Sequence, residues 1–487
     1  MPAPTQLQDS SLWHAEEALI NGEWIKTEQT FAVTDPATGL VLGQVPILGV
    51  KETHKAVETA HKAFLSWTKK TGKERGDVLA KIAALMRLHF DDLATIITLE
   101  NGKSLSEAKV EVNMSIGQVE WMSGEAQRGY GDVIPSALPN VRNLVIKQGV
   151  GVAAIITPWN FPQSMIVRKA AAAFAAGATI VAKAPKETPF SSLAFGDLCL
   201  RAGLPKGVYN VVTTNSSSVV GSELCAHPLV RKLSFTGSTP IGRLLAAQSA
   251  ATLKKCSFEL GGNAPFIVFD DIDDAKFDAA VESAAAVKFR CSGQVCIASN
   301  RLLIQRGIYE RFANALVSKV KQFKVGAGID ASTTHGPLIN ASAVEKVDEH
   351  VHDAINKGAK LLQGGQRLGD NFYAPTVLSG GTADMLVSSD ETFGPLALLY
   401  VFDTEEEAIA LANATEYGLA GYFWSDNLSR VWRVAEAINV GMVGINGASV
   451  SQPCAPFGGC NQSGYGREGS KYGMEEYQEI KLVAMTV

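Results

Sequence analysis

The sequence contains little that would support a metal site, a disulfide framework or a membrane anchor. Its 487 residues include seven cysteines, an odd number, and neither a Cys-x-x-Cys pair nor a cysteine–histidine quartet occurs, so we predict no metal. The longest apolar run, residues 170–182, is too short to cross a bilayer and has Lys169 and Lys183 at its ends. Residues 1–9 lack the apolar centre of a signal peptide, and we expect a reducing, cytosolic setting.

Neither positive nor negative charge is in large excess. The formal net charge is -5 and charged residues make up 19% of the chain, so no basic field exists to bind nucleic acid or an anionic membrane. The hydrophobic fraction of 46% is typical of a soluble globular enzyme. A chain of this length is expected to form about three domains.

Periodicity predicts how the chain is organised. Short strands with turns are expected over 21–50, helices over 51–122, and an exposed hairpin over 129–148 that is suited to pairing with another subunit. From residue 151 to 242, short apolar strands alternate with helices, and a second such series runs from about 266 to 450. This alternation predicts an α/β fold with open, doubly wound parallel sheets.

Ligands of parallel sheets bind beyond the carboxyl ends of the strands, and two segments lie at such ends. In residues 236–242, Gly237 permits a turn and Ser238 can begin a helix whose free amides attract phosphate, although ordinary helix capping explains the same pattern. After the strand that ends at residue 182, Lys183 and Lys186 are either solvated or contact an adenine ribose. An ammonium at Lys186 would favour a 2′-phosphate.

A literal Gly-x-Gly-x-x-Gly occurs at Gly464, Gly466 and Gly469. No clear strand precedes it, and too little chain follows for a crossover helix and a partner strand. We therefore interpret it as unrelated to dinucleotide binding.

Three residues together suggest covalent catalysis. Cys296 offers a nucleophile, Glu259 a carboxylate base and Asn160 an amide donor for an oxyanion. Each alone has an ordinary structural explanation, since an isolated cysteine is usually a small buried apolar residue. A cysteine hydrolase would need a histidine next to Cys296; the eight histidines form no protease signature, and His350 and His352 look like a solvated helix face.

Over nearly its full length the sequence resembles the aldehyde dehydrogenase superfamily. The matching segments, in chain order, are 158–162 (Pro-Trp-Asn-Phe-Pro), 235–238 (Phe-Thr-Gly-Ser), 259–262 (Glu-Leu-Gly-Gly), 293–296 (Gly-Gln-Val-Cys), 391–395 (Glu-Thr-Phe-Gly-Pro) and 456–459 (Pro-Phe-Gly-Gly). Residues 463–473 are most similar to the succinate-semialdehyde branch.

The resemblance implies an aldehyde-dehydrogenase-like fold of three parts. These are a cofactor-binding domain (1–128 and 149–260), a catalytic domain (261–465) and a small β bridging element (129–148 and 466–487). It implies a homodimer or a homotetramer.

The resemblance also implies roles for individual residues. Cys296 attacks the aldehyde, Asn160 and the Cys296 N–H hold the oxyanion, and Glu259 activates water. Lys169 and Glu468 match positions linked to proton relay. The implied cofactor contacts are Thr157, Trp159, Lys183, Lys186, Gly237, Ser238, Leu260, Glu391 and Phe393.

The implied substrate is succinate semialdehyde, because Arg168, Arg290 and Ser451 match positions that grip the distal carboxylate in that branch. Glutarate semialdehyde or 2-oxoglutarate semialdehyde could use the same arginines. Lys186 stands where relatives that prefer NAD carry Glu, so NADP is the favoured cofactor, with NAD left open. A non-enzymatic, crystallin-like member of the fold is disfavoured because Cys296, Glu259 and Asn160 are all present.

Overall fold

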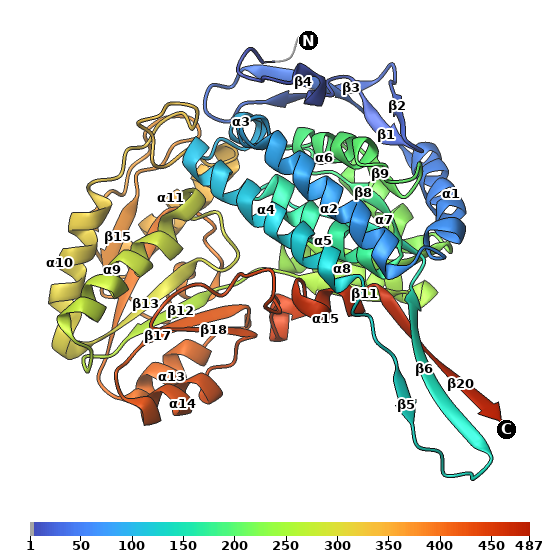
Figure 1. Cartoon of the computed structure of the whole chain (residues 1–487). Helices are drawn as coiled ribbons and strands as arrows, with labels where there is room; N and C mark the ends of the chain where they lie inside the picture. The colour runs from blue at the N-terminus through green and yellow to red at the C-terminus, as the bar shows by residue number, and fades with distance from the viewer. Residues whose placement is uncertain (1–3) are drawn as a thin grey trace.

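The computed structural model describes residues 4–487 and contains two large β-sheets covered by helices, together with a projecting β-arm (Figure 1). The helices are α1 (Val50–Trp67), α2 (Gly72–Leu88), α3 (Phe90–Asn101), α4 (Leu105–Glu125), α5 (Pro162–Ala176), α6 (Phe190–Arg201), α7 (Ser217–Ala226), α8 (Thr239–Ser249), α9 (Asp274–Phe289), α10 (Tyr309–Val320), α11 (Ala341–Asn356), α12 (Leu386–Ser389), α13 (Glu405–Asn413), α14 (Leu428–Ala437) and α15 (Ser470–Glu475). No helix among the described residues is both long and apolar enough to span a bilayer.

The first large sheet has the order β19-β11-β10-β7-β8-β9-β1-β2. Its five central strands are parallel, whereas β1, β2 and β19 are antiparallel additions at the edges. The strands of this sheet are β1 (Ala18–Ile20), β2 (Glu23–Ile25), β7 (Val152–Ile156), β8 (Thr179–Lys183), β9 (Tyr209–Val212), β10 (Val230–Thr236), β11 (Lys255–Glu259) and β19 (Gly464–Tyr465). Residues in β7 and β8 are all buried, as expected for strands covered on both faces.

The order of these strands creates a crevice. From β7 the chain moves outward through β8 and β9, and then returns to the other side of β7 to form β10 and β11. The carboxyl ends of β7 and β10 therefore lie side by side where the winding direction reverses, the place at which open parallel sheets bind ligands. Thr157 follows β7, and Gly237 follows β10.

The second large sheet has the order β14-β15-β16-β13-β12-β17-β18, and all neighbours except β14 and β15 are parallel. Helices α9 and α10 pack on one face and α11, α13 and α14 on the other (Figure 1). Its strands are β12 (Ala264–Val268), β13 (Ser299–Gln305), β14 (Lys360–Gln363), β15 (Thr376–Ser379), β16 (Leu396–Phe402), β17 (Ala420–Trp424) and β18 (Met442–Ile445).

One short connection joins the two sheets and places them end to end. Residues 260–263 lead from the carboxyl end of β11 to the amino end of β12, next to which β13 begins. A Cβ atom on Gly262 would lie 2.3 Å from the Cys296 carbonyl oxygen, so this residue must be glycine for the two segments to approach so closely. The carboxyl end of one sheet thus faces the amino end of the other.

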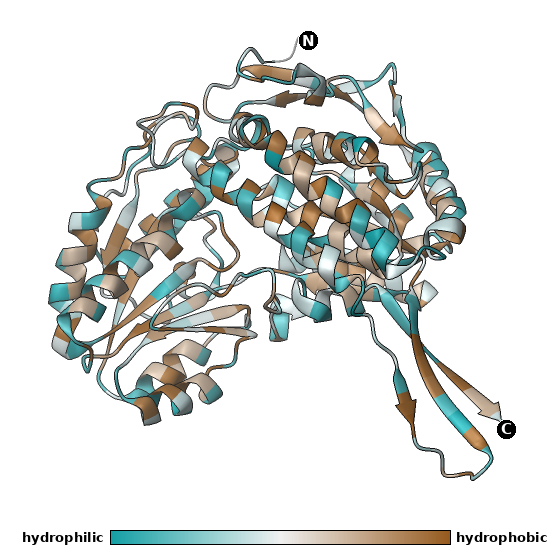
Figure 2. Ribbon diagram, viewed as in Figure 1, coloured by the Kyte–Doolittle hydropathy of each residue, from teal (hydrophilic) through white to brown (hydrophobic). Residues whose placement is uncertain are grey.

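The arm consists of β5 (Asp132–Ile134), β6 (Val141–Gly149) and β20 (Gln478–Thr486), and confirms the hairpin expected over 129–148. Strand β20 pairs antiparallel with the whole of β6. The arm extends away from the body, and much of its ribbon has the brown colour of apolar residues (Figure 2). Val133, Ile480 and Leu482 in the arm are at least 60% exposed. A separate hairpin of β3 (Thr30–Thr34) and β4 (Val41–Pro46) lies near the N-terminus.

The predicted α/β architecture is confirmed. Gly464 belongs to β19, which pairs antiparallel with β11 and is followed by the short helix α15 and by β20. The expectation that too little chain follows for a helix and a strand is therefore wrong, but β20 pairs with β6 in the arm and not with the sheet that contains β19. The motif is therefore not a strand–turn–helix crossover unit.

Candidate functional site

A cavity of about 260 Å³ lies where the two sheets meet. It is formed by the segments after β7, β10 and β11 of the first sheet and by loops before β13 and β16 of the second. The predicted residues that line it are Cys296, Glu259, Asn160, Trp159, Gly237, Ser238, Leu260, Glu391 and Phe393. The remaining lining residues, which we did not predict, are Pro158, Met165, Thr236, Gly261 and Lys346.

The loop before Cys296 has a tightly turned backbone that places Cys296 at the cavity. Cys291 and Ser292 adopt left-handed conformations (φ 50° and 53°), and Gly293 follows with φ 77°. A Cβ atom on Gly293 would lie 2.1 Å from the Gly394 carbonyl oxygen. The Gln294 side chain accepts the Ile339 N–H at 2.9 Å. These contacts fix the loop, so that the thiol is held in place before any ligand binds.

Glu259 and Cys296 are electrostatically coupled. Burial, followed by the neighbouring Glu468 charge, raises the pKa of Glu259 to about 7. Burial and the Glu259 carboxylate raise the pKa of the Cys296 thiol well above its ordinary value. No nitrogen or oxygen donor among the described residues bonds to either Glu259 oxygen, and the Cys296 thiol is the hydrogen-bonding neighbour of this carboxyl. A carboxyl with a pKa near neutrality, beside a thiol that keeps its proton, can act as a general base.

One hydrogen bond fixes the Asn160 side-chain amide and uses one of its two N–H groups. Its Nδ2 donates to the Gln294 carbonyl oxygen at 2.9 Å, and the residue is 3% exposed. An amide nitrogen carries two hydrogens. The second N–H remains able to donate to an oxygen that develops charge in the cavity.

A charged cluster lies behind the cavity. Lys169 Nζ contacts Thr236 Oγ1 at 2.6 Å and also pairs with Glu468, while Arg168 Nε lies 3.0 Å from Glu468 Oε2. Burial raises the pKa of Glu468, whereas the positive charges of Lys169 and Arg168 lower it. The charges have the larger effect, so the pKa lies below its ordinary value. Two cations thus face one fully ionised carboxylate. Within residues 4–487, Arg168 Nη2 has no hydrogen-bond partner.

A second cavity, of about 320 Å³, shares Thr236, Gly237 and Ser238 with the first and is also lined by Thr157 and Lys183. Burial lowers the pKa of Lys183 to about 8. Helix α8 starts here, and its N-cap Ser238 makes no side-chain capping bond. Lys186 is exposed, 3.6 Å from Glu187, and lies outside the cavity lining.

Glu391 and Phe393 close the other end of the first cavity. Glu391 Oε1 accepts the Gly262 N–H at 3.0 Å, and burial raises the pKa of Glu391 to about 7. The Phe393 ring meets Trp159 edge-to-face at 5.7 Å. Lys346 on α11 donates to the Glu391 carbonyl oxygen at 2.6 Å. Lys346 belongs to none of the motifs in the sequence, so its place at the cavity could not be anticipated.

All three predicted substrate residues lie outside this lining. Arg168 is buried in the charged cluster, with its guanidinium 4.4 Å from the centroid of the Phe457 ring. The Arg290 guanidinium stacks over Phe161, 5.3 Å from the ring centroid, and lines a separate hollow that also contains Glu107. Ser451 is partly exposed in the loop after β18. Their binding roles remain predictions.

The histidines need one correction. His350 is 2% exposed, and its Nδ1 lies 3.1 Å from Thr392 Oγ1, so the expectation that it faces solvent is wrong. Burial lowers its pKa to about 4. His352, by contrast, is exposed.

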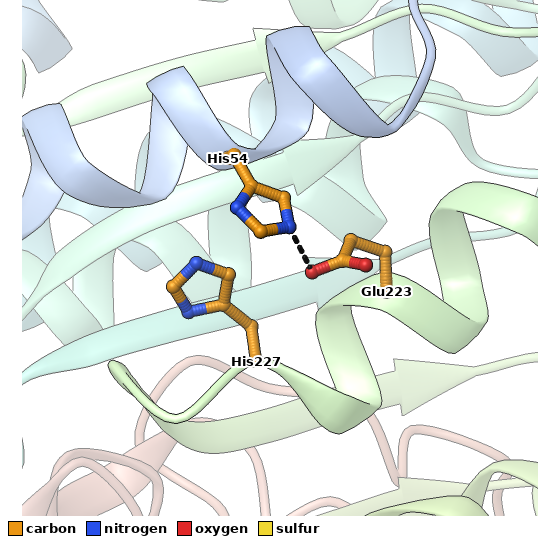
Figure 3. Close-up of side chains that lie close together, drawn as sticks. All are labelled: His54, Glu223 and His227. Carbon is orange, nitrogen blue, oxygen red and sulfur yellow. Dashed lines mark ion pairs between the residues drawn. The ribbon is translucent and has the colours of Figure 1, made fainter.

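Figure 3 shows a second histidine group, which joins α1 to α7. His54 Nε2 pairs with Glu223 at 2.7 Å, and His227 Nδ1 accepts the Leu229 N–H at 3.2 Å. A neutral imidazole that accepts at one nitrogen carries its proton on the other, so neither nitrogen of His227 is free to bind a metal. We therefore describe the group as a contact between two helices.

Comparison with known proteins agrees with this geometry. The model of the aldehyde dehydrogenase family matches residues 24–483. The chain belongs to the aldehyde dehydrogenase family. The family resemblance seen in the sequence is thereby confirmed.

Several curated aldehyde dehydrogenases are similar over essentially the whole chain. The succinate-semialdehyde dehydrogenase [NADP(+)] of Escherichia coli is 52% identical, with 99% of both chains covered. The glutarate-semialdehyde dehydrogenase of Pseudomonas putida is 51% identical, with 99% of this chain and 100% of the relative covered. The 3-sulfolactaldehyde dehydrogenase of Pseudomonas putida is also 51% identical, with 99% of both covered.

Among solved structures, the succinate-semialdehyde dehydrogenase of Burkholderia pseudomallei superposes with a TM-score of 0.97 at 50% identity. The match covers 99% of this chain and 100% of that one. The predicted aldehyde-dehydrogenase-like fold is thus confirmed.

Proposed function

We propose that this aldehyde dehydrogenase oxidises succinate semialdehyde to succinate, with NADP as the preferred cofactor and NAD as a second one. The observation that carries the substrate class is the buried Arg168, whose Nη2 has no partner among the described residues. With Lys169 it gives the site two cations against the single ionised Glu468. Such a surplus favours an aldehyde that carries an anion.

Catalysis begins at the Cys296 sulfur. Glu259, with a pKa of about 7, takes the thiol proton as the sulfur adds to the aldehyde carbon to form a thiohemiacetal. The Asn160 amide and the Cys296 backbone N–H donate to the new oxyanion, and removing one such donor costs roughly 3–4 kcal/mol in comparable sites. The nicotinamide cofactor, when bound, supplies the acceptor for hydride from this carbon.

Glu259 acts again in the second half of the reaction. Before water attacks, Lys169 and Glu468 carry the thiol proton away from Glu259, a role supported by their contact with each other and with Thr236. Glu259, ionised again, removes a proton from water, which attacks the acyl carbon of the Cys296 thioester. The C–S bond breaks, the sulfur takes that proton, and the acid and the thiol are released.

The residues that surround the two joined cavities fit a dinucleotide. Glycine and serine follow β10, and the α8 start offers amides that suit a pyrophosphate. Lys183 would contact the adenine ribose, Glu391 and Phe393 the nicotinamide ribose, and Lys186 the 2′-phosphate. Thr157, Trp159 and Leu260 would line the path between them.

Glutarate semialdehyde, or 2-oxoglutarate semialdehyde, is the second candidate substrate. A relative named for glutarate semialdehyde is as similar as the others. The substrates in all three relatives' names carry a carboxylate or sulfonate group in addition to the aldehyde. Arg168, together with Arg290 and Ser451, would bind that anionic group. The proposal therefore specifies the negative charge of the substrate more strongly than its chain length.

Initial rates decide between these candidates. We expect kcat/KM for succinate semialdehyde to exceed that for the five-carbon semialdehydes and for butyraldehyde, a neutral aldehyde of the same length. Arg168→Met should reduce kcat/KM at least tenfold more for the semialdehyde than for butyraldehyde, a difference of about 1.4 kcal/mol. An equal loss for both aldehydes would contradict the role of Arg168.

We also propose the division of labour within the chain. Residues 1–128 and 149–260 bind the cofactor, residues 261–465 catalyse, and residues 129–148 and 466–487 bridge subunits in a homodimer or homotetramer. The exposed apolar strands of the arm support the last assignment, because such edges are normally covered. The proposed setting is the cytoplasm.

A further inference from the structure

The segment that presents Asn160 leads into a helix that cannot cap itself. Helix α5 begins at Pro162, which has no N–H, and its N-cap Phe161 offers no side-chain acceptor. The next two amides, those of Gln163 and Ser164, both donate at 3.0 Å to Glu111 Oε1. Glu111 belongs to α4 and is 0% exposed. A carboxylate from another helix therefore fixes the start of α5.

Lys103 completes this arrangement from the loop between α3 and α4. Its side chain is fully buried, and Nζ donates to Glu111 Oε2 at 2.6 Å and to the Asn160 carbonyl oxygen at 2.7 Å. The ammonium also lies 3.9 Å from the centroid of the Phe161 ring. The ammonium group thus has three contacts, one for each hydrogen, and two of them are to residues 160 and 161.

Stability alone is a poor explanation for this pair. Two charges removed from water lose several kcal/mol of hydration each, and well-packed apolar side chains are often as stabilising. The pair instead fixes a position. Its four hydrogen bonds hold the Asn160 backbone and the first turn of α5 in place relative to α4.

We propose that Lys103 and Glu111 are positioning residues that hold Asn160 where its amide can reach the oxyanion. This inference rests on the proposed function, in which Asn160 is the oxyanion donor. Asn101, which donates from Nδ2 to the Trp159 carbonyl oxygen at 2.9 Å, holds the preceding residue of the same segment. The backbone on both sides of the Asn160 α-carbon is therefore anchored.

The test compares kcat in Lys103→Met and in the charge-neutral double variant Lys103→Met/Glu111→Gln, which keeps an oxygen to cap α5 and guards against misfolding. We expect kcat to fall by about 10- to 100-fold, as for other small displacements of catalytic groups. The KM for NADP and the alkylation rate of Cys296 by iodoacetamide should stay within about twofold, because the pair touches neither.

Repeating the Lys103→Met/Glu111→Gln change in an Asn160→Ala background separates positioning from general damage. We expect little further loss of kcat there, because the pair acts through Asn160. Two results would overturn the inference. One is a fall in kcat in the Asn160→Ala background as large as the fall in the wild-type background, and the other is an unchanged kcat in the wild-type background. Full activity of Asn160→Ala itself would instead contradict the oxyanion role in the proposed function.

Glu100→Gln is the matched control. Glu100 on α3 caps α6 in the same way, by accepting the Phe190 and Ser191 N–H groups at 2.8 and 2.9 Å, and within residues 4–487 it makes no hydrogen bond to Asn160. We expect its kcat to equal that of the wild type. A fall in kcat as large as that of the Lys103 variants would mean that any buried cap matters equally, and would overturn a specific role for Lys103 and Glu111.

Discussion

Replacing Glu468 by glutamine should make the enzyme work at lower pH. The Glu259 base has a pKa of about 7, raised by burial and then by the Glu468 charge, while Lys169 and Arg168 lower it. Glu468→Gln removes the negative neighbour and leaves both cations without their carboxylate partner. Both changes lower the pKa of Glu259, so we expect the acidic limb of the pH profile to move down.

The expected size follows from the ionisation equilibrium. A fall of about one pKa unit corresponds to ~1.4 kcal/mol, and at pH 6 it would raise the ionised fraction of Glu259 from about one-tenth to about one-half. The maximal rate should fall as well, because Glu468 takes part in the proposed proton relay.

The assay is kcat/KM for succinate semialdehyde at saturating NADP over about pH 6 to pH 9, since kcat/KM reports ionisations of the unbound site. Glu475→Gln, which removes a carboxylate of α15 that pairs with Lys147 on β6, should keep the wild-type midpoint. A Glu468→Gln midpoint that stays in place or rises would refute the coupling.

Three further predictions concern the cofactor, the loop and the arm. Lys186→Glu should lower the NADP/NAD ratio of kcat/KM by about tenfold or more, because a carboxylate repels a 2′-phosphate; an unchanged ratio would remove Lys186 from the cofactor site. Gly262→Ala should strongly reduce kcat with the chain still folded, as judged by circular dichroism, because its Cβ would lie 2.3 Å from the Cys296 carbonyl oxygen; normal kcat would show that the loop can yield. Ile480→Lys/Leu482→Lys on β20 should reduce the mass in solution measured by light scattering, whereas an unchanged mass would place the subunit contact elsewhere.

The sequence predicts much of the site because the motifs follow strands. Asn160 comes after β7, Ser238 after β10, and Glu259 ends β11, and parallel strands bring their carboxyl ends to one edge. Periodicity therefore places Asn160 and Ser238 at one edge of the sheet, whereas the grouping of Glu259 with them rested on residue chemistry and on the resemblance to the family.

Contacts between distant segments could not be foreseen. The Lys103 side chain reaches a backbone oxygen 57 residues away, and nothing in its own neighbourhood marks it as buried. His350 and His352 share one helix but point in different directions, because the i and i+2 positions of a helix lie on different faces. The guanidinium of Arg290 lies over Phe161, and its direction depends on a side-chain contact that no local pattern encodes.

The most direct test of the central claim uses Glu259→Gln, which should form the thioester more slowly, because the base for the thiol is missing, and should accumulate it, because the base for hydrolysis is missing as well. The variant is mixed with succinate semialdehyde and NADP, quenched in acid, and examined by intact mass and peptide mapping. We predict one succinyl group on Cys296, together with a burst of NADPH of at most one equivalent per site. A burst that leaves the Cys296 peptide unmodified, or a succinyl group on another residue, would contradict covalent catalysis by this thiol.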